Sequence, residues 1–433
     1  MKMVSTRADS PPVSLSEAIR QGQAPDGGLY MPCELPSAAM GEAPETLSLP
    51  RSAARFLAPV FSGDALASEL AEICETAFDF DVPLVQPDPA RPGLHVLELF
   101  HGPTGAFKDF GGRFLMECLD RLSDPRAPLT VLAATSGDTG GAVGCAAEGR
   151  AGVRAVILFA KGRVSAFQRH QLTCWDAPVS ALEVDGDFDA CQALVKAAFR
   201  DRTLRERHHL TSANSINLAR LLPQAAYLAW AVRRVEASTG RRPGLILPTG
   251  NLGHGVAAAI AAAMGAPVGP LVLATNANAT LSDWAKTGEY TPRASIATIA
   301  NAMDVGAPSN FERLSAMRDV AESARVERVD DEQIRARIRA DYETSGYVWC
   351  PHSATAAEAY ARLEAKEREA RPWIVAATAH PYKFADIVEP LIGRSVVPTP
   401  ALRAVTDRES RARPLKPELS ALADHLDHRL ETA

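Results

Sequence analysis

Short apolar runs alternate with helical patterns over most of the chain, from about residue 95 to residue 390. The runs are mostly bounded by Gly, Pro, Ser or Asn, which is typical of strands buried on both faces. They predict strands at 95–100, 129–134, 154–159, 245–247, 271–275 and 373–378. Apolar residues at helical spacing predict helices at 109–122, 139–148, 188–200, 215–236, 256–264 and 354–371. This alternation predicts the α/β class, with mostly parallel sheets flanked by helices, and a ligand site in the loops that follow the strands.

The two ends of the chain have a different pattern. The first 90 residues combine a Pro/Gly-rich start with a helical pattern over 53–78. The tail after residue 390 is rich in charges and proline, and only 417–430 has the pattern of a short amphipathic helix. We interpret the rest of the tail as a linker or a surface segment.

Composition narrows the classes of function. Hydrophobic residues make up 46% of the 433 positions and charged residues 23%, which is ordinary for a globular protein. The formal net charge is -6, so no global basic field favours nucleic acid or an anionic membrane, and we expect neither as a partner. The ten histidines are dispersed and form no metal-binding motif, so we expect no metal site.

The cysteines and the N-terminal segment indicate the compartment. The seven cysteines are scattered without a Cys-x-x-Cys pair, which suits a reducing environment better than a disulfide framework. The start of the chain lacks the apolar stretch of a secretion signal, and the longest apolar stretch, 256–264, is too short to span a bilayer. We therefore expect a cytoplasmic protein.

The first candidate loop, HGPTGAFKD at 101–109, joins a predicted strand to a predicted helix. Lys108 stands at the start of that helix, where the helix dipole favours anions rather than cations. A solvated surface lysine is one interpretation. A partly desolvated lysine with a lowered pKa is the other, and it suits covalent attachment of a carbonyl-bearing cofactor.

The second and third loops offer backbone N–H groups at helix starts. ATSGDTGG at 134–141 suits a carboxylate or phosphate, although an ordinary helix cap is the simpler alternative. PTGNLGHG at 248–255 has neither the dinucleotide fingerprint nor the Walker A pattern. It is either a structural turn or a phosphate cradle. Taken by themselves, the three loops indicate an α/β enzyme that binds a phosphorylated ligand.

In this order the loops resemble those of the fold type II pyridoxal-phosphate enzymes, which have the tryptophan synthase β-like fold, and in detail those of threonine synthases. The similarity runs from residue 5 to about 388. The matching stretches are 5–7, 24–29, 100–110, 135–141, 161–165, 214–217 with Arg220, 248–255, 274–278, 288–290, 303–304, 309–313 and 377–384. Two positions depart from the family pattern: Gly105 replaces a leucine and Leu252 an aromatic residue.

The resemblance implies a domain organisation and a role for each site residue. It implies an N-terminal threonine-synthase domain (1–90), a catalytic region of two subdomains (91–390) and a C-terminal tail (391–433). Lys108 would form the covalent link to pyridoxal 5'-phosphate, and Thr378 would bond the pyridine nitrogen. The cofactor phosphate would be held by main-chain N–H groups of Gly250, Asn251, Leu252, Gly253 and His254. The substrate carboxylate would be received by Thr135, Ser136, Asp138 and Thr139, and the substrate phosphate by Asn214, Ser215 and Arg220.

The implied reaction converts O-phospho-L-homoserine and water to L-threonine and phosphate, in a monomer or a homodimer. Some alternatives stay open. Asn214 and Ser215 could merely cap the helix predicted at 215–236. The chain could be another fold type II enzyme, such as a serine/threonine dehydratase or a cysteine synthase, or a catalytically silent binding protein. Only a phosphorylated substrate needs a second phosphate site, so Asn214 and Arg220 discriminate between these possibilities.

Overall fold

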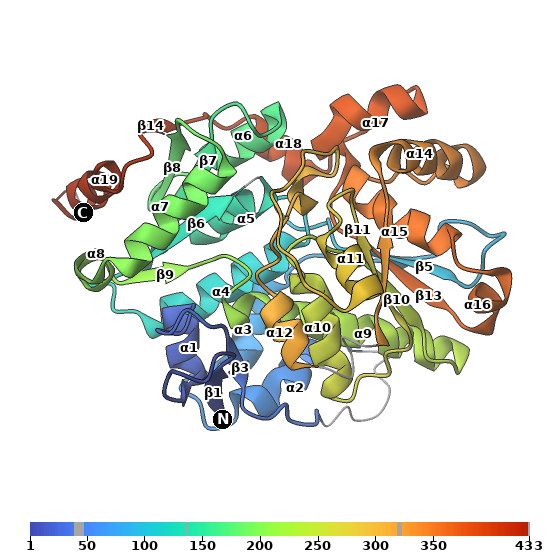
Figure 1. Ribbon diagram of the computed structural model, residues 1–433, viewed down its shortest axis with the longest axis horizontal. Helices are drawn as coiled ribbons and strands as arrows, with labels where there is room; N and C mark the ends of the chain where they lie inside the picture. The colour runs from blue at the N-terminus through green and yellow to red at the C-terminus, as the bar shows by residue number, and fades with distance from the viewer. Residues whose placement is uncertain (39–46, 136, 318–322, 432–433) are drawn as a thin grey trace.

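Two parallel sheets form the centre of the molecule, and a small antiparallel sheet lies beside them near the N-terminus (Figure 1). The structure is a computed structural model that describes residues 1–38, 47–135, 137–317 and 323–431. Within these residues no helix is both long and apolar enough to cross a bilayer. The same residues contain no group of His, Cys, Asp or Glu side chains that could hold a metal ion.

The first parallel sheet has six strands, of which only the edge strand β4 is antiparallel to its neighbour. Its order is β12 (Arg325–Arg328), β11 (Leu271–Thr275), β10 (Gly244–Pro248), β13 (Trp373–Ala377), β5 (Leu94–Glu98) and β4 (Leu84–Val85). The inner strands β10, β11 and β13 are buried at every residue because helices cover the sheet. This confirms the strands predicted from continuous apolar runs.

The second sheet has five strands, all parallel. Its order is β14 (Arg413–Leu415), β8 (Val179–Val184), β7 (Val153–Ala160), β6 (Leu129–Thr135) and β9 (Leu210–Ser212). The helix α5 (Asp138–Ala147) and the helix α7 (Phe188–Arg200) pack against β6 and β7. Strands β8, β9, β12 and β14 were not predicted, because they are short or carry polar residues within the run.

The helix predicted at 215–236 is wrong in its first turns. A short 3-10 helix η1 (Leu218–Arg220) comes first, and the long helix α9 (Leu222–Thr239) follows it. The side chain of Asn217 accepts a hydrogen bond from a backbone N–H of η1, and Pro223 occupies the first turn of α9. Both features favour a new helix start here. Arg220 therefore precedes the long helix instead of lying on it.

Two further predicted helices are each divided in two. The pattern over 53–78 is split into α2 (Leu49–Phe61) and α3 (Leu70–Ala77), and Gly63 between them has a φ of 71°. The pattern over 354–371 is split into α15 (Pro351–Ala361) and α16 (Ala365–Ala370), where Glu364 forms a capping box. Hydrophobic spacing continued across both breaks, so the sequence pattern did not reveal them. The other predicted helices are confirmed within three residues as α4 (Lys108–Leu122), α5, α7 and α10 (Gly253–Ala263).

The two ends of the chain pack onto the central sheets. The N-terminal part consists of β1 (Lys2–Ser5), β2 (Val13–Ser14), α1 (Leu15–Gln21), β3 (Tyr30–Pro32), α2 and α3, and its helix α3 contacts α4. The tail is more than a linker. It forms α18 (Pro400–Thr406), adds β14 to the second sheet, and packs α19 (Leu419–Glu431) against α7. The remaining helices are α6 (Ala166–Thr173), α8 (Arg202–Arg207), α11 (Thr280–Thr287), η2 (Asn301–Met303), α12 (Phe311–Ala316), α14 (Asp331–Ser345), η3 (Pro381–Phe384) and α17 (Ala385–Ile392).

Candidate active site

Three neighbouring strands of the six-stranded sheet bring three predicted site segments together. Strands β10, β13 and β5 are adjacent and parallel, so their carboxyl ends lie at one edge of the sheet. The backbone N–H of Phe107 donates to the carbonyl of Thr378 over 2.8 Å, and the ring of Phe107 stacks on that of His254 at 5.1 Å. The start of α4, the residue after β13 and the loop before α10 therefore meet at one place.

Lys108 is the first residue of α4, and its side chain is partly buried. Among the described residues no hydrogen bond or ion pair holds its amine, which lies 4.4 Å from the centre of the Phe107 ring. Burial and the charge of Arg220 lower the pKa of Lys108 to about 8, against the opposite effect of Asp138. About a tenth of the amine is therefore neutral at pH 7, and nucleophilic attack on a carbonyl requires that neutral form.

The loop 250–254 has the geometry of an anion cradle. Leu252 is fully buried and has a φ of 60°, in the left-handed region that residues other than glycine rarely adopt. A side chain at Gly250 would lie 2.7 Å from the Cα of Met303, so this position requires glycine. The free N–H groups of α10 follow at Gly253 and His254. This arrangement fits the phosphate of a cofactor.

His254, the last residue of the cradle, is buried in the first turn of α10. Burial and the charge of Lys108 lower the pKa of His254 to about 3, so its imidazole is neutral at physiological pH. Its Nε2 lies 3.0 Å from the hydroxyl oxygen of Tyr227. A neutral ring at this place adds no positive charge beside the amine of Lys108.

A network of amides joins the predicted cofactor loop to the predicted substrate site. Asn251 donates through Nδ2 to the hydroxyl of Ser215 over 2.7 Å, and Asn310 donates to the same hydroxyl over 3.1 Å. Below them Arg313 is fully buried and donates to the carbonyls of Ser215, Ile216 and Tyr30. Burial lowers the pKa of Arg313 to about 9. The structure thus fixes the backbone of 215–216 next to the cradle.

Arg220 is 1% exposed and only partly satisfied. One terminal nitrogen donates to the carbonyl of Ala213, whereas Nε has no partner among the described residues, and burial lowers the pKa of Arg220 to about 10. The Oδ1 of Asn214 is also buried without a partner. A side chain at Gly111 would lie 2.6 Å from Nε, so the glycine leaves the guanidinium its room. Buried polar atoms without partners are costly unless a ligand satisfies them.

The capping alternative for Asn214 and Ser215 is wrong. The residue before α9 is Leu221, and no side chain caps that helix. The residue that does cap at this point is Asn217, on η1.

Polar groups of the loop between β6 and α5 are already bonded within the protein. The hydroxyl of Thr135 accepts hydrogen bonds from the N–H groups of Gly137 and Gly140, each over 3.0 Å. Asp138 is buried and forms an ion pair with Lys383 over 3.0 Å. Thr139, in the first turn of α5, is partly exposed. Ser136 lies outside the described residues.

Lys383, Asn310 and Arg313 belong to this centre although the sequence predicted no role for them. All three fall inside stretches that match the family pattern, and this was the only signal. Their burial and their partners follow from chain segments far apart in sequence, for instance the bond from Arg313 to Tyr30.

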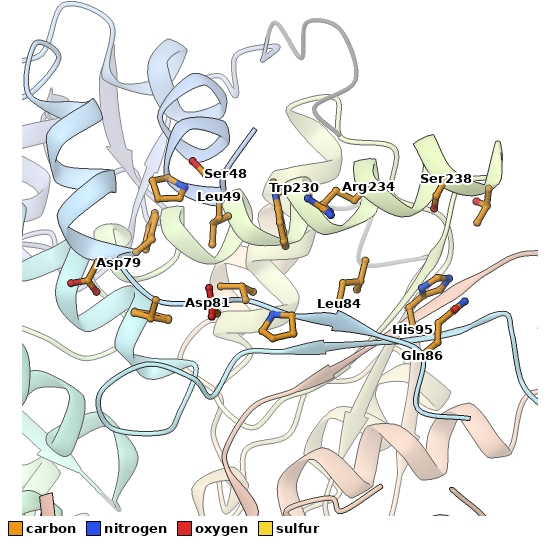
Figure 2. A pocket seen from close by; sticks show the side chains of 16 residues that line it. Ser48, Leu49, Asp79, Asp81, Leu84, Gln86, His95, Trp230, Arg234 and Ser238 are labelled. Carbon is orange, nitrogen blue, oxygen red and sulfur yellow. The ribbon is translucent and has the colours of Figure 1, made fainter. Parts of the chain in front are cut away.

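A surface groove among the described residues lies away from the predicted site. It has a volume of about 990 Å³ and lies beside α9 and β4, as Figure 2 shows. Trp230 and Arg234 line one side, and Asp79, Asp81 and His95 line the other. No predicted site residue lines it. The candidate active site is therefore formed by the loops described above and not by this groove.

The fold and the site loops define a class: a pyridoxal-phosphate-dependent enzyme of fold type II, with a lysine at a helix start and a glycine-containing cradle beside it. The sequence matches the families described as pyridoxal-phosphate dependent enzyme over 83–378, threonine synthase N terminus over 2–78 and threonine synthase, C-terminal over 353–426. The chain belongs to the threonine synthase family.

Threonine synthases from other organisms are similar to this chain over nearly its full length. The threonine synthase of Serratia marcescens is 37% identical, covering 93% of this chain and 94% of that protein. The one from Escherichia coli K12 is 36% identical, with 92% of each chain covered. Among solved structures, threonine synthase from Escherichia coli (35% identical, 99% of this chain and 100% of that one) and pyridoxal-phosphate-bound threonine synthase from Brucella melitensis (33%, 99% of each) both superimpose with a TM-score of 0.90. The predicted family, fold class and cofactor are confirmed.

Proposed function

We propose that this chain converts O-phospho-L-homoserine and water to L-threonine and inorganic phosphate, which makes it a lyase acting on phosphates. The observation that supports the proposal is a buried donor without a partner. Nε of Arg220 has no hydrogen-bond partner among the described residues, and Arg220 is not part of the cradle at 250–254. The cradle takes the phosphate of the cofactor, and the Arg220 site takes the phosphate of the substrate. A guanidinium suits a phosphate through its fork of donors.

The residues present fit the cofactor. Lys108 has a free amine of lowered pKa, Gly250 permits close approach, and Thr378 lies beside the lysine loop. When bound, pyridoxal phosphate supplies a carbonyl for Lys108 and a ring that stabilises negative charge on the substrate. Gly250, Asn251, Leu252, Gly253 and His254 would hold its phosphate. The neutral hydroxyl of Thr378 would face its ring nitrogen.

Lys108 is the proton carrier in this proposal. Its amine takes the proton from Cα of the substrate and one proton from Cβ as the phosphate leaves Cγ. It returns one proton to Cγ, which becomes the methyl group, and one to Cα; the water that adds at Cβ supplies a hydroxyl there and a proton to the phosphate. A pKa of about 8 suits both directions at neutral pH, because the group is then neither a very weak base nor a very weak acid.

The other residues place the substrate. Arg220, Asn214 and Ser215 hold the phosphate at the point where it leaves Cγ. The start of α5, with the loop of Thr135 and Ser136 and the residues Asp138 and Thr139, would receive the carboxylate at free N–H groups, since the Asp138 side chain already has a cationic partner. Water then adds at Cβ.

The cysteines of the chain form no disulfide among the described residues, which supports a reducing, cytoplasmic compartment.

The experiment is a product assay on the purified, cofactor-loaded enzyme supplied with O-phospho-L-homoserine. We expect phosphate and threonine in equal amounts. Keto-acid formation from threonine, without phosphate release from phosphohomoserine, would instead identify a dehydratase. A protein that takes up the cofactor but turns over neither substrate would be a silent binding protein.

A further inference from the structure

Lys383 is fully buried and lies on η3, shortly after Thr378. Its ammonium makes three contacts: 2.7 Å to the carbonyl of Thr104, 2.6 Å to Oε1 of Gln171 and 3.0 Å to Oδ1 of Asp138. An ammonium has three donors, so every one of them is used. Lys383 is thus held firmly and has no free donor for a ligand.

These contacts connect elements that follow strands of the two parallel sheets. Thr104 lies in the loop after β5, just before Lys108, and Lys383 follows β13, so both come directly after strands of the six-stranded sheet. Asp138 begins α5 after β6, and Gln171 lies on α6 after β7, so both come after strands of the five-stranded sheet. Gln171 also donates to the carbonyl of Thr104 over 2.9 Å. The lysine loop and the substrate-carboxylate loop therefore meet at Lys383.

The charges around the amine of Lys108 come from several elements. His254 on α10 and His352 on α15 are neutral, because burial lowers their pKa values to about 3 and about 4. Arg220 on η1 lowers the pKa of Lys108, and Asp138 on α5 raises it. Asp138 is the one described carboxylate that opposes the lowering. Burial acts to raise the pKa of Asp138 itself, but the charge of Lys383 and the hydrogen bonds from Lys383 and Gln168 outweigh it, so that pKa is below its usual value.

We propose that Lys383 is a positioning residue that binds the Asp138 carboxylate and so prevents it from pairing with the amine of Lys108. Without Lys383, the buried carboxylate would lack a cation. Lys108 follows Thr104, a contact of Lys383, in the same loop, and its amine has no partner among the described residues, so it is the lysine that could replace Lys383. If Lys108 paired with Asp138, its amine would stay protonated and would point away from the cofactor. This inference rests on the proposed role of Lys108.

The test measures the protonation of Lys108 directly. The full chain, stripped of cofactor, is labelled with a trace of acetic anhydride at a series of pH values, and labelling of the Lys108 peptide is read by mass spectrometry. The unaltered chain should give a midpoint near pH 8. Lys383→Met should raise the midpoint by roughly one unit or more, since an unpaired carboxylate then faces the amine. Lys196→Met, at an exposed lysine of α7, is the matched control and should leave it unchanged.

Two further variants separate this charge effect from simple loosening. Asp138→Asn should lower the midpoint, and the double variant Lys383→Met with Asp138→Asn should return it to within about half a unit of the unaltered chain. If Lys383→Met does not fold, the direction of the Asp138→Asn shift still decides. An unchanged or raised midpoint in Asp138→Asn overturns the proposal, and so does a raised midpoint that persists in the double variant. Where the cofactor attaches is a separate measurement, so failure here is distinguishable from failure of the proposed function.

Discussion

Basic side chains that are buried or partly buried occur in two kinds of surroundings among the described residues. In the first, around Arg313 and Lys383, every element that meets the cation offers a carbonyl, an amide oxygen or a carboxylate. In the second, around Lys108 and Arg220, the amine has no hydrogen-bond partner among the described residues and the guanidinium has an unpaired Nε. The two regions are neighbours, joined through Ser215 and Asp138.

The difference distinguishes cations that hold the fold together from cations that are available to bind or react. A satisfied buried cation ties segments together and can do little else, whereas a buried donor without a partner raises the free energy of the folded state by about 1–3 kcal/mol. A protein tolerates this cost where a bound ligand supplies the missing hydrogen bond. In the proposed function the unsatisfied pair lies where the cofactor and the substrate bind, and the satisfied pair holds the loops in place. Each variant below alters one side of this comparison.

The largest effect is expected for Lys108→Ala. Turnover should fall by at least about 10³-fold, because the variant lacks both the attachment point and the proton carrier. The thermal midpoint should change little, since the side chain has no hydrogen bond to lose. Steady-state phosphate release and a thermal melt measure both effects. Near-normal turnover would contradict the assignment.

Arg313→Lys should act on stability instead. A lysine cannot replace the five hydrogen bonds of the guanidinium to Tyr30, Ser215, Ile216 and Asn310, so carbonyls in a buried site lose their donors. We expect the free energy of unfolding to fall by about 3 kcal/mol. Urea unfolding followed by circular dichroism measures it. A loss under about 1 kcal/mol would show that Arg313 is not a structural cation.

Arg220→Lys probes the unsatisfied side. The charge remains, but the two-pronged donor is lost, so kcat/KM for phosphohomoserine should fall about ten- to a hundred-fold, equivalent to roughly 1.5–3 kcal/mol. The absorption spectrum of the bound cofactor should not change, because its phosphate uses the 250–254 loop. Loss of cofactor with substrate affinity preserved would exchange the two phosphate assignments.

The pH dependence of cofactor attachment is the smallest effect. The neutral amine of Lys108 is the reactive form, and its pKa is lowered to about 8. The attachment rate should therefore rise about tenfold per unit up to pH 8 and level off above it. A lysine with an ordinary pKa would show a rate that still rises at pH 10. Stopped-flow absorbance on the stripped enzyme follows the rate.

The same contrast explains what the sequence could predict. Continuous apolar runs such as Leu271–Thr275 identified the strands of the sheet centre, because burial on both faces leaves a local signature. The strands β9 and β12 have no such signature, since their pairing depends on neighbours far along the chain. The loops at Lys108 and 250–254 were visible through their glycines and their place after strands.

The satisfied cations were not visible in the sequence. Lys383 differs from a surface lysine only through Gln171, Thr104 and Asp138, which come from other elements. The surroundings of Arg220 were mispredicted for a related reason: the cap at Asn217 outweighed a continuous helical pattern. Local pattern locates reactive loops, and tertiary contacts decide which charges are held.

The most direct test of the account asks which lysine carries the cofactor. The loaded enzyme is reduced with borohydride and digested, and the modified peptide is sequenced by mass spectrometry. The account predicts the cofactor on Lys108 alone, because its amine is unpaired and of lowered pKa. Modification of Lys383, whose three donors are all bonded, would contradict the central claim that unsatisfied cations mark the chemistry of this site.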